Sequence, residues 1–188
     1  MAMDTKTALL NSAERAARRL GFDGFSYAYL AEEVGIRKAS IHHHYPSKAT
    51  LSVALMQRYH ADFEKACRDI ETAETLGSGR LLALINRYRS ALDGGKSLCL
   101  CVSFSTSRES LPPDVITQIS RFRAMLISWL KVTLEVGKSD GTIAGVGNLG
   151  QEAAAILPLL EGAQLAARAE ENPDLFDKAM QLLVNRLC

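Results

Sequence analysis

The chain has 188 residues, and its balance of 47% hydrophobic and 23% charged residues excludes an intrinsically disordered protein. Its formal net charge of +1 excludes a protein coated with nucleic acid along its whole length. No apolar run is long enough to span a bilayer, the N-terminal residues lack the apolar core of a signal peptide, and the four cysteines are too unevenly spaced for a secreted disulfide framework, so a cytoplasmic location is expected.

Positive charge gathers at one end of the chain. Residues 1–60 hold eight Lys or Arg against five Asp or Glu, whereas the remaining residues hold fourteen against sixteen. A modest basic excess confined to one end is typical of a small nucleic-acid-binding head on a neutral body.

Three helices are predicted within the first 47 residues. Apolar residues recur at helical spacing over residues 8–20, and Ser26 is a typical N-cap for a second helix. Gly35 supplies a tight turn before a mostly polar third helix, Arg37 to His44, in which Ile41 faces inward. A short polar helix held against an apolar one is typical of a helix-turn-helix, whose second helix enters the major groove of DNA.

The rest of the chain is also predicted to be helical, because no alternating strand pattern of convincing length occurs. The predicted helices run from Ser47 to about Ile70, from the Gly77-Ser78-Gly79 break to about Leu92, from Cys99 to Arg108, from Pro112-Pro113 to about Val136, and, after a glycine-rich loop from Gly137 to Gly150, over about 151–168 and 173–187. The expected fold class is all-α with about nine helices. We expect a DNA-binding domain over 1–47 and an effector-binding and dimerisation domain over 48–188.

The helix expected over about 151–168 is apolar on nearly all sides, interrupted mainly by Glu161 and Gln164. A helix that is apolar all round has to bury both sides, and Gly162 and Ala166 are small enough for close helix contact. Together with the last helix, 173–187, it predicts a homodimer through a four-helix bundle. The alternative is that this helix is the core of a monomer.

The segment from Ser40 to Leu51, SIHHHYPSKATL, carries a family resemblance. It resembles the run T-L-Y-x-Y/H-F-x-S-K-E-x-L that closes the helix-turn-helix of the TetR family of one-component transcriptional regulators. Agreement continues upstream through Gly21-Phe22, Phe25-Ser26 and Leu30-Ala31, so the resemblance covers roughly the first third of the chain. It implies a protein that binds operator DNA as a dimer through an N-terminal head.

Residues of the predicted recognition segment are expected to contact DNA. With Ile41 inward, the spacing turns Arg37 and Lys38 toward guanine edges or phosphates, and the resemblance implies a base-reading position at His42 and a phosphate contact at Lys48. The full set expected to contact DNA is Ser26, Tyr27, Arg37, Lys38, Ser40, His42, His43, Tyr45 and Lys48. The alternative is that these are solvated polar residues without a role in binding.

The effector pocket or sensing site is expected among Cys99, Cys101, Phe104, Phe122, Met125 and Trp129. The surroundings of the two cysteines look like core, where a free cysteine behaves as a small hydrophobe. The alternative is a thiol that senses electrophiles or oxidants, with Arg108 or Lys96 lowering its pKa. The stretch from Cys99 to Phe104 is similar to the electrophile-sensing branch of the TetR family, although Ser107 stands where that branch has a second cysteine.

Other patterns do not indicate chemistry. Gly145 to Gly150 matches G-x-G-x-x-G, but no strand precedes it, so a loop is expected. Three consecutive histidines, 42 to 44, point about 100° apart on a helix and cannot converge on one metal ion. No nucleophile–base arrangement or paired-carboxylate spacing stands out, so we expect no enzyme, no metal and no cofactor.

The sequence therefore predicts a ligand-responsive transcriptional repressor. Its homodimer is expected to bind a palindromic double-stranded operator and to be released by a small apolar or electrophilic effector, with no membrane as partner. Two alternatives stay open: a thiol-based redox or electrophile sensor acting through Cys99 or Cys101, and a DNA-binding module without an effector.

Overall fold

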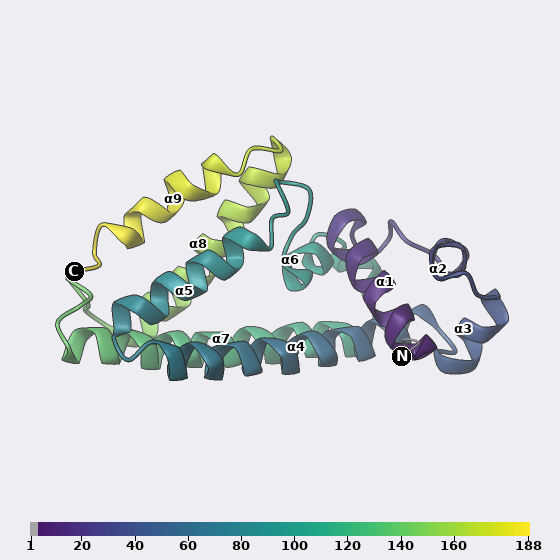
Figure 1. The fold of residues 1–188 in the computed structure, drawn as a ribbon, viewed down its shortest axis with the longest axis horizontal. Coiled ribbons are helices and arrows are strands. Elements are labelled where there is room, and N and C mark those ends of the chain that lie inside the picture. The colour runs from purple at the N-terminus through teal and green to yellow at the C-terminus, as the bar shows by residue number, and fades with distance from the viewer. Residues whose placement is uncertain (1–3) are drawn as a thin grey trace. The chain divides into compact units, whose positions relative to one another are not determined.

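The computed structural model describes residues 4–188, which form nine α-helices, one short 3-10 helix and no strand (Figure 1). The helices are α1 (Thr5–Leu20), α2 (Tyr27–Val34), α3 (Lys38–His44), α4 (Lys48–Ala73), α5 (Gly77–Ser90), α6 (Leu100–Ser105), η1 (Arg108–Ser110), α7 (Pro113–Ser139), α8 (Leu149–Ala169) and α9 (Asp174–Val184). The predicted all-α class is confirmed. The first three residues of the predicted DNA-binding domain lie outside the described residues.

The chain divides into two compact units. The first unit comprises the described residues up to Ala61 together with Leu100–Ser120, and the second comprises Asp62–Cys99 together with Arg121–Cys188. Helices α4 and α7 each contribute to both units. The described part of the domain predicted over residues 1–47 falls inside the first unit. This unit also includes the beginning of α4, helix α6 and the beginning of α7.

The first unit is built around α1. Its buried residues, among them Leu9, Ala13 and Ala17, recur at helical spacing along one side of the helix. Helix α6 packs on α1, and the buried Ser103 hydroxyl donates a 2.5 Å hydrogen bond to the carbonyl of Ala17. This contact joins a segment that is distant in sequence to the three N-terminal helices.

In the second unit α5, α8 and α9 pack against one another, as Figure 1 shows. Phe63 of α4 makes edge-on ring contacts with Tyr88 of α5 and with Phe122 of α7, at centroid distances of 6.1 Å and 5.1 Å. The C-terminus is tied to the loop before α8, because the backbone N–H of Cys188 donates to the carbonyl of Thr142 at 3.0 Å. Aromatic packing and backbone hydrogen bonds thus fix the helices of this unit.

Two predicted boundaries in the second unit are wrong. Gly77 and Gly79 lie in the first turn of α5, and Gly137 lies inside α7, which continues to Ser139. A Cβ on Gly77 would come within 2.2 Å of the Gly137 Cα, so these glycines allow the start of α5 and the end of α7 to touch. Close approach of two backbones accounts for Gly77, and close packing of the Ile143 side chain accounts for Gly137, so neither glycine marks a break in its helix.

Candidate nucleic-acid interface

A helix-turn-helix forms where the sequence predicts it. Ser26 caps α2, because its side chain accepts a hydrogen bond from the backbone N–H of Tyr29 at 3.2 Å. Gly35 follows α2 with a φ of +73°, a left-handed conformation that favours glycine. The chain then turns into α3, in which Ile41 is fully buried.

The outward side of α3 is polar and basic. Arg37, Lys38, His42 and His43 are exposed, and Ser40 is half-buried. His42 also contacts its own unit, since its ring meets the Tyr27 ring edge-on at 4.9 Å and its Nδ1 lies 3.3 Å from the carbonyl of Pro46. An exposed polar surface on a short helix can meet base edges and phosphates.

Two predicted contact residues are buried. Tyr27 and Tyr45 are only 7% and 5% exposed, and the Tyr27 hydroxyl donates a 2.9 Å hydrogen bond to the carbonyl of Tyr45. Burial, with a smaller electrostatic effect of Tyr45, raises the pKa of Tyr27 to about 12. The Tyr27 hydroxyl therefore supports the joint between α2 and the end of α3, and the side chains of both tyrosines are covered by the first unit itself.

Lys48 occupies a position between the surface and the core of the first unit. Its Nζ donates to the carbonyl of Phe25 at 2.7 Å and lies over the rings of Phe22 and Phe25, at 4.6 Å and 4.4 Å from their centroids. Burial lowers the pKa of Lys48, and nearby Asp23 opposes that shift. The lysine thus holds the segment between α1 and α2 in addition to any contact with phosphate.

Two polar side chains that join helices of the first unit were not predicted from the sequence. Arg58 of α4 reaches α1, where its guanidinium donates to Asn11 Oδ1 at 2.8 Å, to the Leu10 carbonyl at 3.0 Å and to Glu14 Oε2 at 2.7 Å. Glu33 of α2 accepts hydrogen bonds of 2.6 Å from both Ser12 and Arg15. Sequence spacing could not reveal these partners, because they lie between 18 and 48 residues apart.

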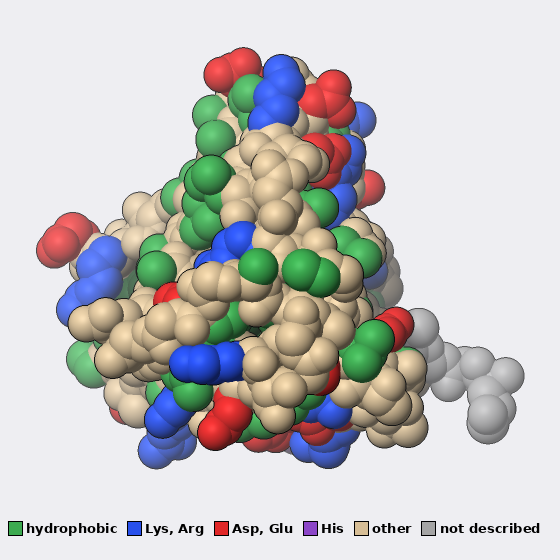
Figure 2. All heavy atoms as spheres, turned by 90° about the vertical axis from the view of Figure 1, so that its left-hand side faces the viewer, with side chains coloured by type: hydrophobic (Ala, Val, Ile, Leu, Met, Phe, Trp, Pro, Cys, Tyr) green, Lys and Arg blue, Asp and Glu red, His purple; other side chains and the backbone are tan. Residues whose placement is uncertain are grey.

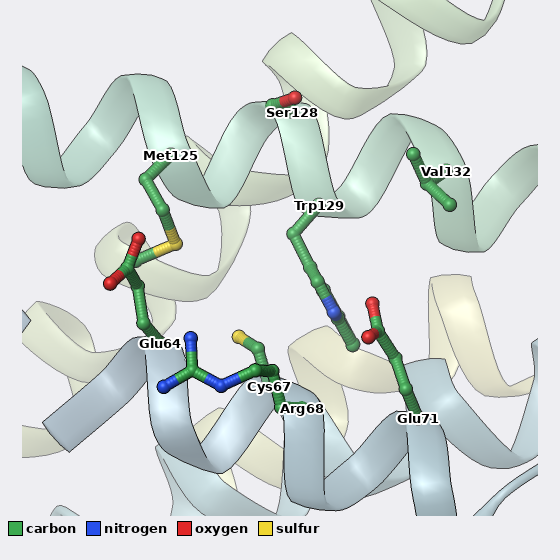
Figure 3. A pocket seen from close by; sticks show the side chains of 8 residues that line it. All are labelled: Glu64, Cys67, Arg68, Glu71, Met125, Ser128, Trp129 and Val132. Carbon is green, nitrogen blue, oxygen red and sulfur yellow. The ribbon is translucent and has the colours of Figure 1, made fainter. Parts of the chain in front are cut away.

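The expected effector residues do not form one site. Cys101 and Phe104 belong to the first unit, where Phe104 contacts Phe22 edge-on, whereas the other four belong to the second. Of those four, Met125 and Trp129 line the same groove, a hollow of about 300 Å³ between α4 and α7 that Figure 3 shows from close by. We call this hollow the α4–α7 groove.

Both cysteines of the proposed sensing site are buried. Cys99 is 1% exposed and Cys101 is fully buried, as the core interpretation predicts. The backbone N–H of Cys99 donates to the Gln164 side chain at 2.9 Å, and that side chain donates in turn to the carbonyl of Tyr88 at 2.7 Å. Gln164 therefore satisfies the backbone at two points inside the second unit.

No cluster of metal-ligating side chains occurs among residues 4–188, and no helix within this range is long and apolar enough to cross a membrane. The G-x-G-x-x-G match is a loop up to Asn148, whereas Leu149 and Gly150 open α8. Asn148 caps that helix through a 3.0 Å hydrogen bond from the backbone N–H of Gln151.

Comparison with known proteins agrees with the helix-turn-helix geometry. Residues 9–55 match the family model for the N-terminal region of "Bacterial regulatory proteins, tetR family". The chain belongs to the TetR family. It is a DNA-binding transcriptional regulator, and the matching family consists of regulators that bind operator DNA and act as dimers, not of enzymes.

Relatives match over nearly the full length. The chain is 25% identical to the "HTH-type transcriptional repressor NemR" of Escherichia coli, covering 97% of this chain and 93% of that protein. A TetR-family transcriptional regulator from Agrobacterium tumefaciens is 28% identical, with a TM-score of 0.91 and 97% of each chain covered. A TetR regulator from Legionella pneumophila is 25% identical, with a TM-score of 0.89 over 100% of this chain and 99% of that one. This TetR-family chain therefore shares its architecture with its relatives beyond the DNA-binding region.

Proposed function

We propose that this TetR-family regulator is a homodimeric repressor that binds an inverted-repeat operator and is released by a small-molecule effector. The observation that carries the proposal is α3, whose outward residues are polar or basic apart from the small Ala39, while Ile41 anchors it from within. Repression is the activity named for the relative from Escherichia coli. We also propose that the protein is cytoplasmic, where operator DNA would be accessible to it, and that it has no catalytic activity.

The proposed DNA contacts follow from exposure. Arg37 directly precedes α3, and Lys38 is its first residue. Both side chains are exposed, so they can contact base edges or phosphates. His42 and His43 extend the same exposed surface, Ser26 lies at the positive end of α2, and Lys48 adds charge nearby. We retain as DNA contacts Ser26, Arg37, Lys38, Ser40, His42, His43 and Lys48.

Helices α8 and α9 are the proposed dimer interface. Along α8 the exposed residues include Ala154, Pro158, Gly162, Leu165 and Ala166, an apolar stripe of mostly small side chains. On α9, Leu182 is 69% exposed. In Figure 2 the part of the second unit built by α8 and α9 carries hydrophobic side chains along one side and charged ones along the other. A stripe of this kind gains stability when a second copy covers it.

Release of the operator DNA by a bound small molecule agrees better with the burial of Cys99 and Cys101 than release by modification of their thiols. Cys99 and Cys101 are buried, and a buried thiol meets an electrophile only after the surrounding helices open. If the thiol alternative held, replacing Cys99 with serine would abolish release of the DNA by alkylating or oxidising agents. The effector proposal expects that variant to respond as the wild type does.

Selection of operator DNA tests the proposal directly. Purified protein would be used to select from random duplexes, and binding of the selected sequences would be measured by fluorescence anisotropy. We expect an inverted repeat with half-site centres about 34 Å apart, and Lys38→Ala should weaken binding or relax base preference within each half-site. Selection of sequences without two-fold symmetry, or binding indifferent to scrambled half-sites, would overturn the proposal.

A further inference from the structure

The α4–α7 groove opens at the surface of the second unit. Val132, on the α7 side, is 46% exposed, and Ser128 is exposed beside it. Trp129 lies deeper and is 8% exposed. The volume of about 300 Å³ is at the lower end of the range for small-molecule sites, and it accommodates a molecule of about two fused rings.

Trp129 leaves one polar group in this groove without a partner. Its Nε1 is buried and has no hydrogen-bond acceptor. Figure 3 shows the indole reaching from α7 toward α4, with its nitrogen in the space beside Glu71. An indole N–H can only donate, so the partner that is missing is an acceptor. A buried donor without an acceptor disfavours the empty groove relative to one that contains an acceptor.

The other side chains of the groove define the rest of the ligand. Met125, Val132 and Cys67 provide apolar surface. Burial raises the pKa of the Cys67 thiol to about 12 against the opposing effect of Arg87, so this thiol stays neutral and does not attack an electrophile. Glu64, Arg68 and Glu71 place two carboxylates and one guanidinium around the groove, an excess of negative charge that disfavours an anion, while the apolar walls favour a neutral molecule.

We propose that the α4–α7 groove binds a small, neutral, planar apolar molecule that accepts a hydrogen bond from Trp129 Nε1. Because Nε1 is covered in the empty groove, the entering ligand displaces a long, flexible rim side chain such as that of Glu71 or Arg68. This ligand would be the effector of the proposed function, whose chemical class is thereby named. Binding in the groove does not depend on the proposed function, whereas release of DNA by the bound ligand does.

A pair of isosteric probes tests the hydrogen bond. Quinoline and naphthalene have the same shape, but only quinoline carries an acceptor nitrogen. Trp129 is the one tryptophan of the sequence, so a ¹H–¹⁵N spectrum contains a single indole N–H signal that reports on this site. We expect quinoline to shift that proton downfield and to bind about fivefold more tightly than naphthalene. Trp129→Phe, which keeps an aromatic ring without the donor, should remove the difference between the probes when binding is measured by calorimetry.

A surface variant locates the binding without disturbing the core. Val132→Glu adds a charge at the mouth of the groove, and it should weaken binding of both probes by about tenfold. Leu82→Glu is the matched control, since Leu82 on α5 is 40% exposed and does not line the groove. An indole signal that does not move at saturating quinoline would overturn the site, as would equal loss of binding in the two variants.

Binding and DNA release are read separately in the same samples. Anisotropy of labelled operator DNA reports release, whereas the indole signal reports occupancy of the groove. Occupancy by quinoline with its preference over naphthalene supports the site whether or not the DNA dissociates. Failure of the operator selection therefore leaves the groove intact, and failure of the indole shift leaves the DNA-binding function intact.

Discussion

Helices α3 and α8 both bury one side, but they expose opposite kinds of surface. In α3 the fully buried Ile41 holds a helix whose outward residues are polar or basic apart from Ala39. In α8 the buried side includes Ile156, Leu157 and Leu160, and the exposed side is again mostly apolar. Water solvates the exposed surface of α3 well, so a partner that displaces this water has to be a polyanion with matching polar groups. The exposed surface of α8 is stabilised when any complementary apolar partner buries it.

The two exposed surfaces suit different partners. A polar, basic surface obtains specificity from hydrogen bonds to base edges and affinity from phosphates. An apolar surface with small side chains obtains affinity from close packing against another helix. Substitutions that exchange these properties, or that weaken the buried side of either helix, test this assignment of partners.

The largest effect is expected at the apolar surface. Replacing Leu165 and Leu182 together with glutamate places four carboxylates in the two-fold interface and should weaken dimerisation by about 3 kcal/mol or more. Analytical ultracentrifugation should then show monomers at micromolar concentration, with loss of cooperative operator binding. Leu82→Glu on α5 is the control and should remain dimeric. A double variant that stays dimeric would place the interface elsewhere.

A smaller effect is expected for Lys48, which acts inside the first unit. Lys48→Met keeps the alkyl chain but removes the hydrogen bond to Phe25 and both ring contacts, so we expect a loss of about 1–2 kcal/mol in the free energy of unfolding by urea. If Lys48 also meets a phosphate, the slope of log affinity against log salt falls by about one, with unchanged base preference. Lys65→Met, at an exposed position of α4, controls for the lost charge. A changed base preference would contradict the phosphate role.

Tyr27 tests the joint between α2 and α3. Tyr27→Phe removes the hydrogen bond to the Tyr45 carbonyl and should lower stability by about 1 kcal/mol at neutral pH, measured by thermal unfolding. The pKa of Tyr27 is raised in the folded protein, so the unfolded chain loses its proton first. The contribution of Tyr27 to the free energy of unfolding should therefore shrink as pH rises above 10. The Tyr27→Phe variant should lack this part of the decrease in stability at alkaline pH. Tyr29→Phe, on the exposed side of α2, should leave both quantities unchanged.

The smallest effect concerns a charge on the buried side of α8. Burial raises the pKa of Glu161 above its ordinary 4.5, although Arg123 of α7 donates a 2.5 Å hydrogen bond to its Oε2. The unfolded chain then gives up this proton at lower pH than the folded protein, so ionised Glu161 disfavours folding at neutral pH. Glu161→Gln should raise the midpoint of urea unfolding at pH 7, and the gain should fade as pH drops below 4.5. Glu135→Gln, exposed on α7, is the matched control, and a Glu161→Gln protein less stable at pH 7 would show that the ion pair dominates.

Much of the first unit could be predicted because its signals are local. The Ser26 cap, the left-handed Gly35 and the inward Ile41 each depend on neighbours within a few residues, and all three are confirmed. The burial of the Tyr27 and Tyr45 side chains could not be predicted, because it depends on how α2 and the end of α3 close on each other. The α4–α7 groove could not be predicted either, because it brings together residues of two helices that lie about 60 positions apart in the sequence.

Periodicity, helix caps and a short motif lie in consecutive residues, so the helical class, the turn between α2 and α3 and the family could be predicted from the amino-acid order alone. The packing of distant segments, by contrast, brings Gly77 and Gly137 into close contact and holds Lys48 at the carbonyl of Phe25. It also left the Trp129 donor without an acceptor and the apolar stripe of α8 uncovered within one chain. Each of these depends on which surfaces meet after the chain has folded, and contacts between distant segments are not encoded in any local pattern.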